Sequence, residues 1–199
     1  WKEAAAMDMQ PNFPWEKYPW QEAIVRFTRL LGAANTNDVA AAKKELKELE
    51  RTHTALTAQK DSYKANQVMI QIKTGEAWVL FAEGKKEEAI EQMKLAAEME
   101  DKTEKSPVTP GEVQPARQLL ADILLEAGKP AEALAAYEAD LKKHPNRFNS
   151  LYGAGIAAER SGNTAKAKLY YGQLLKVSNG ADPSRAELGM AKSVLKTMP

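Results

Sequence analysis

The sequence has no cysteine and only two histidines among its 199 residues. Without cysteine, the chain has no disulfide framework, no thiolate nucleophile and no cysteine-ligated metal. With two histidines, nucleophilic triads and zinc sites have almost no material. We therefore expect no catalytic residues, no metal and no cofactor, and we interpret the protein as non-enzymatic.

Neither an excess of one charge nor a long apolar run is present. Lys and Arg together number 28, against 27 Asp and Glu, and the two signs are interspersed. A general nucleic-acid binder needs a basic face to neutralise phosphates, so this balance argues against nucleic acid as a partner. No apolar run approaches the roughly 20 residues that span a bilayer, so membrane insertion is not expected.

What the sequence does contain is an internal repeat. The first copy carries Gly128, Ala133, Tyr137 and Pro145, and the second carries Gly162, Ala167, Tyr171 and Asn179 at the same offsets. A third copy follows Gly84, with Ala89, Met93 and Ala96, and has methionine where an aromatic residue is usual. The period, about 34 residues, is typical of a helix-turn-helix repeat.

This pattern resembles the tetratricopeptide repeat (TPR), in which small and large residues at fixed places let two helices lie close. The resemblance implies an all-α fold: a right-handed α-solenoid of antiparallel helix hairpins with a C-terminal capping helix. We expect a single solenoid over residues 19–199 because a stack of repeats grows without one closed core. The hairpins are expected at about 19–59, 61–102, 115–144 and 147–178, and the capping helix at 183–197. The first hairpin is only repeat-like.

Irregular segments extend the resemblance to nearly the whole chain. Residues 18–24, 30–34, 99–111, 115–120 and 146–159 look like the C-terminal half of a bacterial family of long TPR proteins of unknown function. The family offers no activity and no catalytic residue to transfer. It implies export and further repeats N-terminal to this region, so a periplasmic or exported location is favoured over the cytoplasm. Ser106 stands where members tend to have histidine, which argues against a metal in that loop.

Two segments lie outside the expected repeats. Residues 1–18 contain prolines that forbid a continuous helix, yet Phe13, Trp15 and Tyr18 are too apolar for a free tail. We interpret this segment as an extended arm whose aromatic side chains lie on the first helices, or else as a linker ordered only against a missing N-terminal domain. Residues 100–114 form an insertion that either carries function or covers the seam between two hairpins.

The chain begins with Trp1 and has no charged and apolar leader. We expect either that a signal segment has been removed or that the sequence is part of a longer protein. The second is favoured because a solenoid that starts on a Trp- and Pro-rich segment would lack its first cap.

A charged run marks the helix that follows the expected turn at residues 35–38. Charges of opposite sign recur there at spacings of three and four residues, which predicts a solvated face made of Lys43, Lys44, Glu45, Lys47, Glu48, Glu50 and Arg51. We expect the cap of this helix from Asn37 or Asp38. The cap of the next helix is expected from Asp61 or Ser62.

Two local patterns could suggest chemistry. Glu50 and His53 have the Glu-x-x-His spacing of di-iron bundles. Such sites need a second motif, and His144 has no glutamate three residues before it, so we interpret His53 as part of a polar face. Gly153 and Gly155 lie within an expected helix, where a small residue permits close packing, rather than in a phosphate-binding loop.

The first helix of each TPR pair lines a concave groove, so the resemblance implies which residues face a partner. These are Gln71, Thr74, Trp78, Phe81, Gln118, Asp122, Leu125, Asn149, Tyr152 and Ile156. Amides could bond the backbone of an extended peptide, while Trp78 and Tyr152 clasp its apolar side chains. The set has no Lys or Arg, so no carboxylate clamp is expected. The alternative is that the aromatic and aliphatic members are core between hairpins.

These patterns predict a non-catalytic interaction module that binds a peptide or protein partner in a concave helical groove. An open face is expected, with Trp78 or Tyr152 partly exposed. The alternative is a structural subunit or scaffold of a larger assembly, held through the N-terminal arm and the 100–114 loop. An enzyme is a distant third hypothesis, because it would need a deep pocket with a buried carboxylate.

Overall fold

The computed structural model describes residues 1–104, 112–182 and 184–197. Within these ranges the chain is all-α, with ten α-helices, one 3-10 helix and no strand. The helices are α1 (Lys2–Ala5), α2 (Pro19–Asn35), α3 (Val39–Ala58), α4 (Ser62–Ala82), α5 (Lys86–Asp101), α6 (Ala116–Glu126), α7 (Pro130–Lys143), α8 (Phe148–Arg160), α9 (Thr164–Val177) and α10 (Ala186–Thr197), and the 3-10 helix is η1 (Trp15–Lys17).

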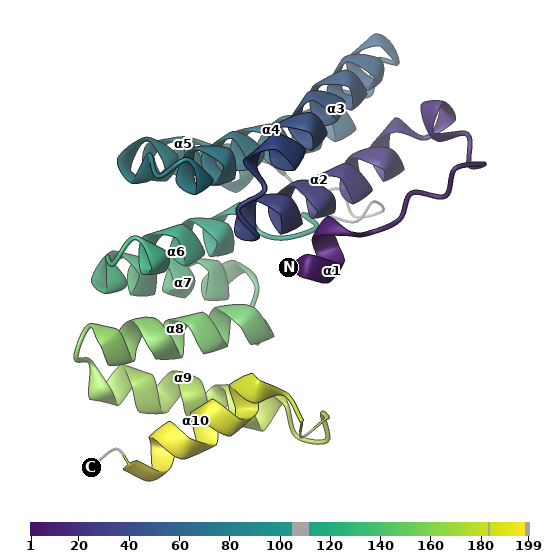
Figure 1. Ribbon diagram of the computed structural model, residues 1–199. Helices are drawn as coiled ribbons and strands as arrows, with labels where there is room; N and C mark the ends of the chain where they lie inside the picture. The colour runs from purple at the N-terminus through teal and green to yellow at the C-terminus, as the bar shows by residue number, and fades with distance from the viewer. Residues whose placement is uncertain (105–111, 183, 198–199) are drawn as a thin grey trace. The chain divides into compact units, whose positions relative to one another are not determined.

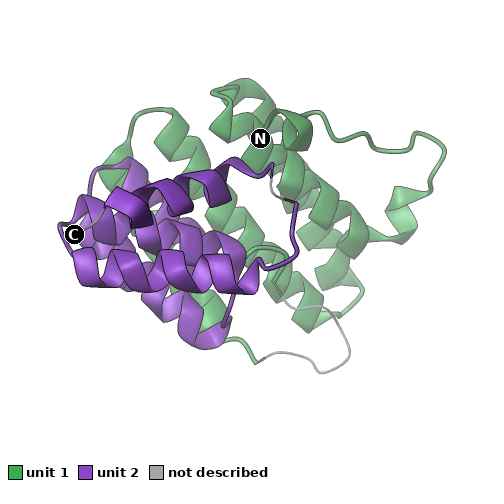
Figure 2. Cartoon of the chain, turned by 90° about the horizontal axis from the view of Figure 1, so that it is seen from below, with its two compact units in different colours: residues 1–116 green, residues 117–199 purple. Residues whose placement is uncertain are grey.

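The chain divides into two compact units, residues 1–116 and residues 117–199 (Figure 2). In unit 1, α2 packs on α3 and α4, α3 packs on α4, and α4 packs on α5. The short helices α1 and η1 lie on α2 (Figure 1). In unit 2, α7 packs on α8, α8 on α9, and α9 on α10. The expected single solenoid over residues 19–199 would require the two units to stack continuously. It therefore stays a prediction.

Five turns share one backbone geometry. They follow α2, α3, α4, α6 and α8, each has three residues, and the second residue takes a positive φ: Asn37, Lys60, Gly84, Gly128 and Gly162. In each turn the third N–H donates to the carbonyl five residues earlier, as from Lys129 to Leu124 at 2.9 Å. Gly128 and Gly162 adopt this conformation without a Cβ penalty, which is why the repeat places glycine there.

The structure chooses between the expected capping residues. Asp38 Oδ1 accepts a hydrogen bond from the Ala41 N–H at 2.9 Å, whereas Asn37 forms the turn with φ 60°. Asp61 Oδ1 accepts from the Lys64 N–H at 3.1 Å and so caps α4. Each cap satisfies one of the free N–H groups at a helix start.

The N-terminal segment is less extended than its prolines predict. Residues Lys2–Ala5 form α1, and residues Trp15–Lys17 form η1. The ring of Phe13 lies 4.6 Å from that of Trp15 and 5.1 Å from that of Tyr18, measured between centroids. These aromatic side chains therefore cluster with each other, while the ring of Trp1 packs near that of Trp78 on α4.

Close helix packing uses glycine opposite a bulky side chain. A Cβ on Gly153 of α8 would overlap the ring of Tyr137, and one on Gly155 would lie 2.6 Å from the ring of Tyr171. Because Tyr137 belongs to α7 and Tyr171 to α9, α8 is held between two tyrosine rings. In unit 1, Gly75 gives the same room to Leu30. The expectation that Gly153 and Gly155 serve packing is confirmed.

The expected solvated face of α3 is wrong at Glu45, whose side chain is buried. Its carboxylate accepts from Arg29 Nε at 2.7 Å and from Arg26 Nη1 at 3.0 Å. Glu22 is also buried, and its carboxylate pairs with Arg26 and with Arg51. Periodicity alone missed this because the partners of Glu45 are arginines on α2, which bring a charge-assisted hydrogen bond to each buried oxygen.

We predict that Gly153→Ala destabilises the protein by about 1–3 kcal/mol, since the added methyl group must displace the Tyr137 ring. The midpoint of urea unfolding, followed by helical circular dichroism, measures the loss. Gly172→Ala is the matched control, because a Cβ there meets nothing within 4 Å and alanine favours a helix. Equal midpoints for the two variants would contradict the packing role.

We also predict that Glu45→Gln lowers the free energy of unfolding by about 2 kcal/mol, because two charge-assisted hydrogen bonds to partly buried arginines weaken. Glu50→Gln changes the same residue type on an exposed position of α3 and should leave stability unchanged. The comparison is made by thermal unfolding at low and high salt. The loss caused by Glu45→Gln should persist at high salt, because salt screens buried charge pairs much less than exposed ones.

Candidate binding surfaces

The predicted partner-facing residues of unit 1 form one stripe along α4. Gln71, Thr74 and Trp78 follow each other at spacings of three and four residues, so they share one helix face. All three are buried, with exposed fractions of 6%, 1% and 2%, and Phe81 is half-buried beyond them. The ring of Phe81 packs edge-on against Trp78 at a centroid distance of 5.9 Å. Of the two residues expected to be partly exposed, Trp78 or Tyr152, Trp78 is not, and its burial agrees with the alternative that it is core.

A small polar cavity of about 10 Å³ adjoins this stripe. It is roughly the size of one water molecule. Amide, hydroxyl and carboxylate groups line it, from Gln67, Gln71, Thr74, Glu100, Glu112 and Gln114, together with apolar Phe27, Ile70 and Val113. Gln71 Oε1 and Trp78 Nε1 are both buried and have no hydrogen-bond partner within the part of the chain that the structure describes.

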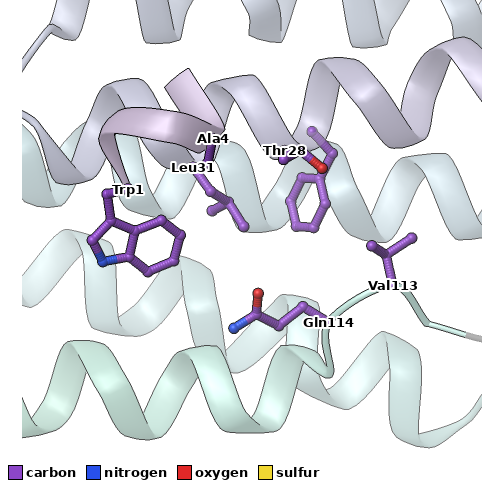
Figure 3. Close-up of a pocket in the computed structure, with 7 residues that line it drawn as sticks. Trp1, Ala4, Thr28, Leu31, Val113 and Gln114 are labelled. Atoms are coloured by element: carbon purple, nitrogen blue, oxygen red, sulfur yellow. The ribbon is translucent and has the colours of Figure 1, made fainter. Parts of the chain in front are cut away.

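A second cavity, of about 50 Å³, lies beside the first and shares Phe27, Val113 and Gln114 with it. Figure 3 shows its walls: Trp1 and Ala4 from the N-terminal segment, Thr28 and Leu31 from α2, and Val113 and Gln114 from the segment before α6. This cavity is lined mainly by apolar side chains. The polar hollow beside the α4 stripe thus adjoins an apolar hollow that is lined by the N-terminal segment, α2 and the segment before α6.

In unit 2 the predicted residues Gln118 and Asp122 belong to a hydrogen-bonded chain. Tyr137 Oη donates to Asp122 Oδ1 at 2.5 Å, and Gln118 Nε2 lies 3.4 Å from Asp122 Oδ2. Arg147 Nε donates to Gln118 Oε1 at 2.6 Å. Burial raises the pKa of Asp122 to about 6, and the negative charge of Glu126 adds to the shift, while the bond from Tyr137 opposes it.

The other predicted residues in this unit are more accessible. Asn149 is exposed, and Leu125, Tyr152 and Ile156 are half-buried. Tyr152 Oη lies 3.1 Å from Met190 Sδ of α10. Tyr152 therefore has the partial exposure that the sequence analysis expects. Because the α4 stripe and these side chains belong to different compact units, their joint groove stays a prediction.

Sequence reasoning missed a buried cluster between α7 and α8. Asp140 is fully buried, its Oδ1 lies 2.7 Å from His144 Nδ1, and its Oδ2 accepts from Ser150 Oγ at 2.5 Å. A nucleophilic serine must hydrogen-bond the imidazole, but here the hydroxyl bonds the carboxylate and is buried. The cluster braces two helices. Its signal in the sequence was Asp140 and His144, one helical turn apart.

Glu50 and His53, which have the Glu-x-x-His spacing, lie at an open surface of α3. His53 is half-buried and lines a hollow of about 530 Å³ with Thr57, Ala65, Met69 and their neighbours. Among the described residues, no group of three or more His, Asp or Glu side chains is placed to hold a metal ion. His53 is thus part of a shallow depression at the joined ends of α3 and α4.

Comparison of the sequence with models of known protein families gives no match, and comparison with curated proteins gives none either. Within the described ranges, none of the helices combines the length and the apolarity that crossing a membrane requires.

We predict that Asp122→Asn stabilises the protein by up to about 2 kcal/mol above pH 6, and by almost nothing near pH 4. In the folded protein the pKa of Asp122 is about 6, which is above the ordinary value for aspartate. At pH values between the ordinary pKa and the folded pKa, the native state therefore binds more protons than the unfolded state. Stability must then fall as pH rises through this window, and asparagine removes the fall while still accepting the bond from Tyr137.

Thermal unfolding midpoints of the wild type and of Asp122→Asn, taken from about pH 4 to pH 7.5, measure this effect. Asp8→Asn, at an exposed carboxylate in the N-terminal segment, is the control for a general change of net charge. A constant difference between Asp122→Asn and wild type across the whole range would contradict the assigned cause.

Proposed function

We propose that the protein is a non-catalytic interaction module of the TPR type, a right-handed α-solenoid of antiparallel hairpins closed by α10. Two features support the TPR assignment. Gly128 and Gly162, one repeat period apart, occupy equal turns. Tyr137 and Tyr171, separated by the same period, are both buried against a glycine of α8. The partner is a peptide or protein segment bound along the first helices of the hairpins.

One observation carries the binding proposal: Gln71 Oε1 and Trp78 Nε1 are buried on one stripe of α4 without a hydrogen-bond partner in the described chain. A buried polar atom without a partner costs about 1–3 kcal/mol. Apolar side chains such as Val68 and Ile72 fill other buried positions of the same helix at no such cost. The amide and the indole are therefore better explained as groups that meet a ligand.

The spacing of these two groups fits a peptide backbone. Seven residues of α-helix separate them, which is about 10 Å along the axis. An extended chain covers the same length in about three residues. Gln71 Oε1 can accept from a peptide N–H, and the Trp78 indole N–H can donate to a carbonyl two or three residues away. Backbone recognition of this kind gives affinity with little dependence on sequence.

We predict that Gln71→Met makes the free protein slightly more stable but weakens partner binding at least about tenfold, because methionine removes the orphan acceptor and keeps the volume. Peptides that bind the full chain are first selected on an array. Their affinities for wild type and Gln71→Met are then compared by calorimetry. Gln21→Met, at an exposed position of α2, is the control.

A loss of stability together with unchanged affinity would show that Gln71 is core, and the proposed site would be abandoned. The Trp78→Ala variant is a weaker test, since truncating a buried tryptophan costs about 3–5 kcal/mol by itself. Its binding result is informative only where circular dichroism shows the native helix content.

The structural-subunit alternative is favoured by the aromatic cluster of the N-terminal segment. Phe13 and Tyr18 keep 39% and 43% of their surface exposed although their rings contact each other. Exposed aromatic groups of this kind suit burial in an assembly. A chain that stays monomeric at high concentration, with the arm and the 100–114 loop cut by protease both alone and in native extract, would count against it. Residues 105–111 of that loop lie outside the described residues.

A further inference from the structure

We propose that the N-terminal turn, residues 1–7, is an intramolecular occupant of the α2–α4 binding surface, which is made by Trp78 of α4 with Arg29 and Gly32 of α2. This surface accepts partner segments of the same chemistry. That chemistry is an aromatic residue followed within one helical turn by two small residues. The inference rests on the proposed function, since it names the partner class for the α4 stripe. It also makes the arm a competitor of that partner.

The surface beneath the N-terminal turn is complementary to the turn in shape. The Trp1 ring lies 6.5 Å from that of Trp78, at an interplanar angle of 45°, so the arm's aromatic side chain packs against the buried indole of the stripe. Trp1 and Ala4 also form one wall of the apolar cavity in Figure 3. A Cβ on Gly32 of α2 would overlap the backbone of Ala4 and Ala5. Only small residues at this point permit such an approach.

The N-terminal turn is attached to the α2–α4 binding surface by few contacts. Helix α1 has four residues, none of them buried and none with a side-chain cap. A helix of this length is unstable without tertiary contacts. Trp1 leaves 52% of its surface exposed, and the residues from Asp8 to Pro14 that follow are exposed or half-buried. The arm can therefore leave the surface without unfolding the helices beneath it.

One polar contact fixes the register of the arm. Arg29 Nη1 donates to the Met7 carbonyl at 2.7 Å, and Arg29 Nε is itself held by Glu45 at 2.7 Å. This donor recognises a backbone carbonyl, so it does not require methionine. A partner segment with an aromatic residue, two small residues and a free carbonyl six residues after the aromatic one can make every contact that the arm makes.

The test uses the labelled peptide WKEAAAMDM, which is residues 1–9, added to the 199-residue chain and followed by fluorescence anisotropy. A tethered segment competes at an effective concentration in the millimolar range, so Trp1→Ala should bind the peptide about tenfold more tightly than wild type. In the Trp1→Ala background, adding Gly32→Ala should weaken binding at least about tenfold, because the added Cβ would overlap the backbone of the bound segment. Adding Gly189→Ala instead should leave it unchanged, because a Cβ there meets nothing within 4 Å.

A control peptide with alanine in place of its tryptophan should bind neither the wild type nor any variant. This control changes the peptide and leaves the protein unaltered. Equal affinity of wild type and Trp1→Ala, or indifference to Gly32→Ala, overturns the inference. A wild type that dimerises while Trp1→Ala stays monomeric also overturns it, since the occupant is then the arm of a second copy. If an array-selected peptide is weakened by Gln71→Met yet binds wild type and Trp1→Ala equally, the proposed function stands and only the arm's role fails.

Discussion

Close approach of helices through small residues is the constraint on which both units depend. Tyr137 fills the space that Gly153 leaves on α8, Tyr171 fills that of Gly155, and Leu30 fills that of Gly75. A bulky side chain can be buried this way only when the facing helix has no Cβ in its path. The same rule seats the N-terminal turn on Gly32. A single packing device thus shapes the core and the surface where we place the ligand.

Helix α2 packs against its neighbours and also supplies the arginines that pair with a buried carboxylate. Glu45 is paired with Arg26 and Arg29, and Arg29 reaches on to the Met7 carbonyl. A buried ion pair contributes little net stability compared with apolar residues of equal volume, but it fixes the position of the groups involved. The arm's register is therefore set by a charge in the helix interface. A change at Glu45 should alter the stability of unit 1 and the position of its N-terminal turn together.

Much of the helix order follows from the sequence because the signals are local. The left-handed turns at Gly128 and Gly162 depend on residues that are close along the chain. The bounds of α2 to α10 lie within the helical ranges expected from the sequence, whereas α1 and η1 are not expected from it. The failures are non-local. Glu45 looked solvated because its arginine partners lie 16 and 19 residues away on α2. Trp78 looked accessible because nothing near it in the chain indicates that Trp1 lies against its ring. Long-range burial depends on which segments fold back onto a helix, and neither spacing nor propensity contains that information.

Within the candidate site, a buried polar side chain distinguishes a binding role from a packing role. A stripe kept only for packing would have apolar groups along its whole length, as Val68 and Ile72 do elsewhere on α4. Gln71 instead brings an amide to a buried position where its oxygen lacks a partner within the described residues, beside a cavity too small for a side chain. Trp1 then closes the apolar end of the same surface with a half-exposed ring. A ligand that replaces Trp1 and donates a hydrogen bond to Gln71 Oε1 would remove the cost of the unpartnered oxygen, which favours the ligand-bound state.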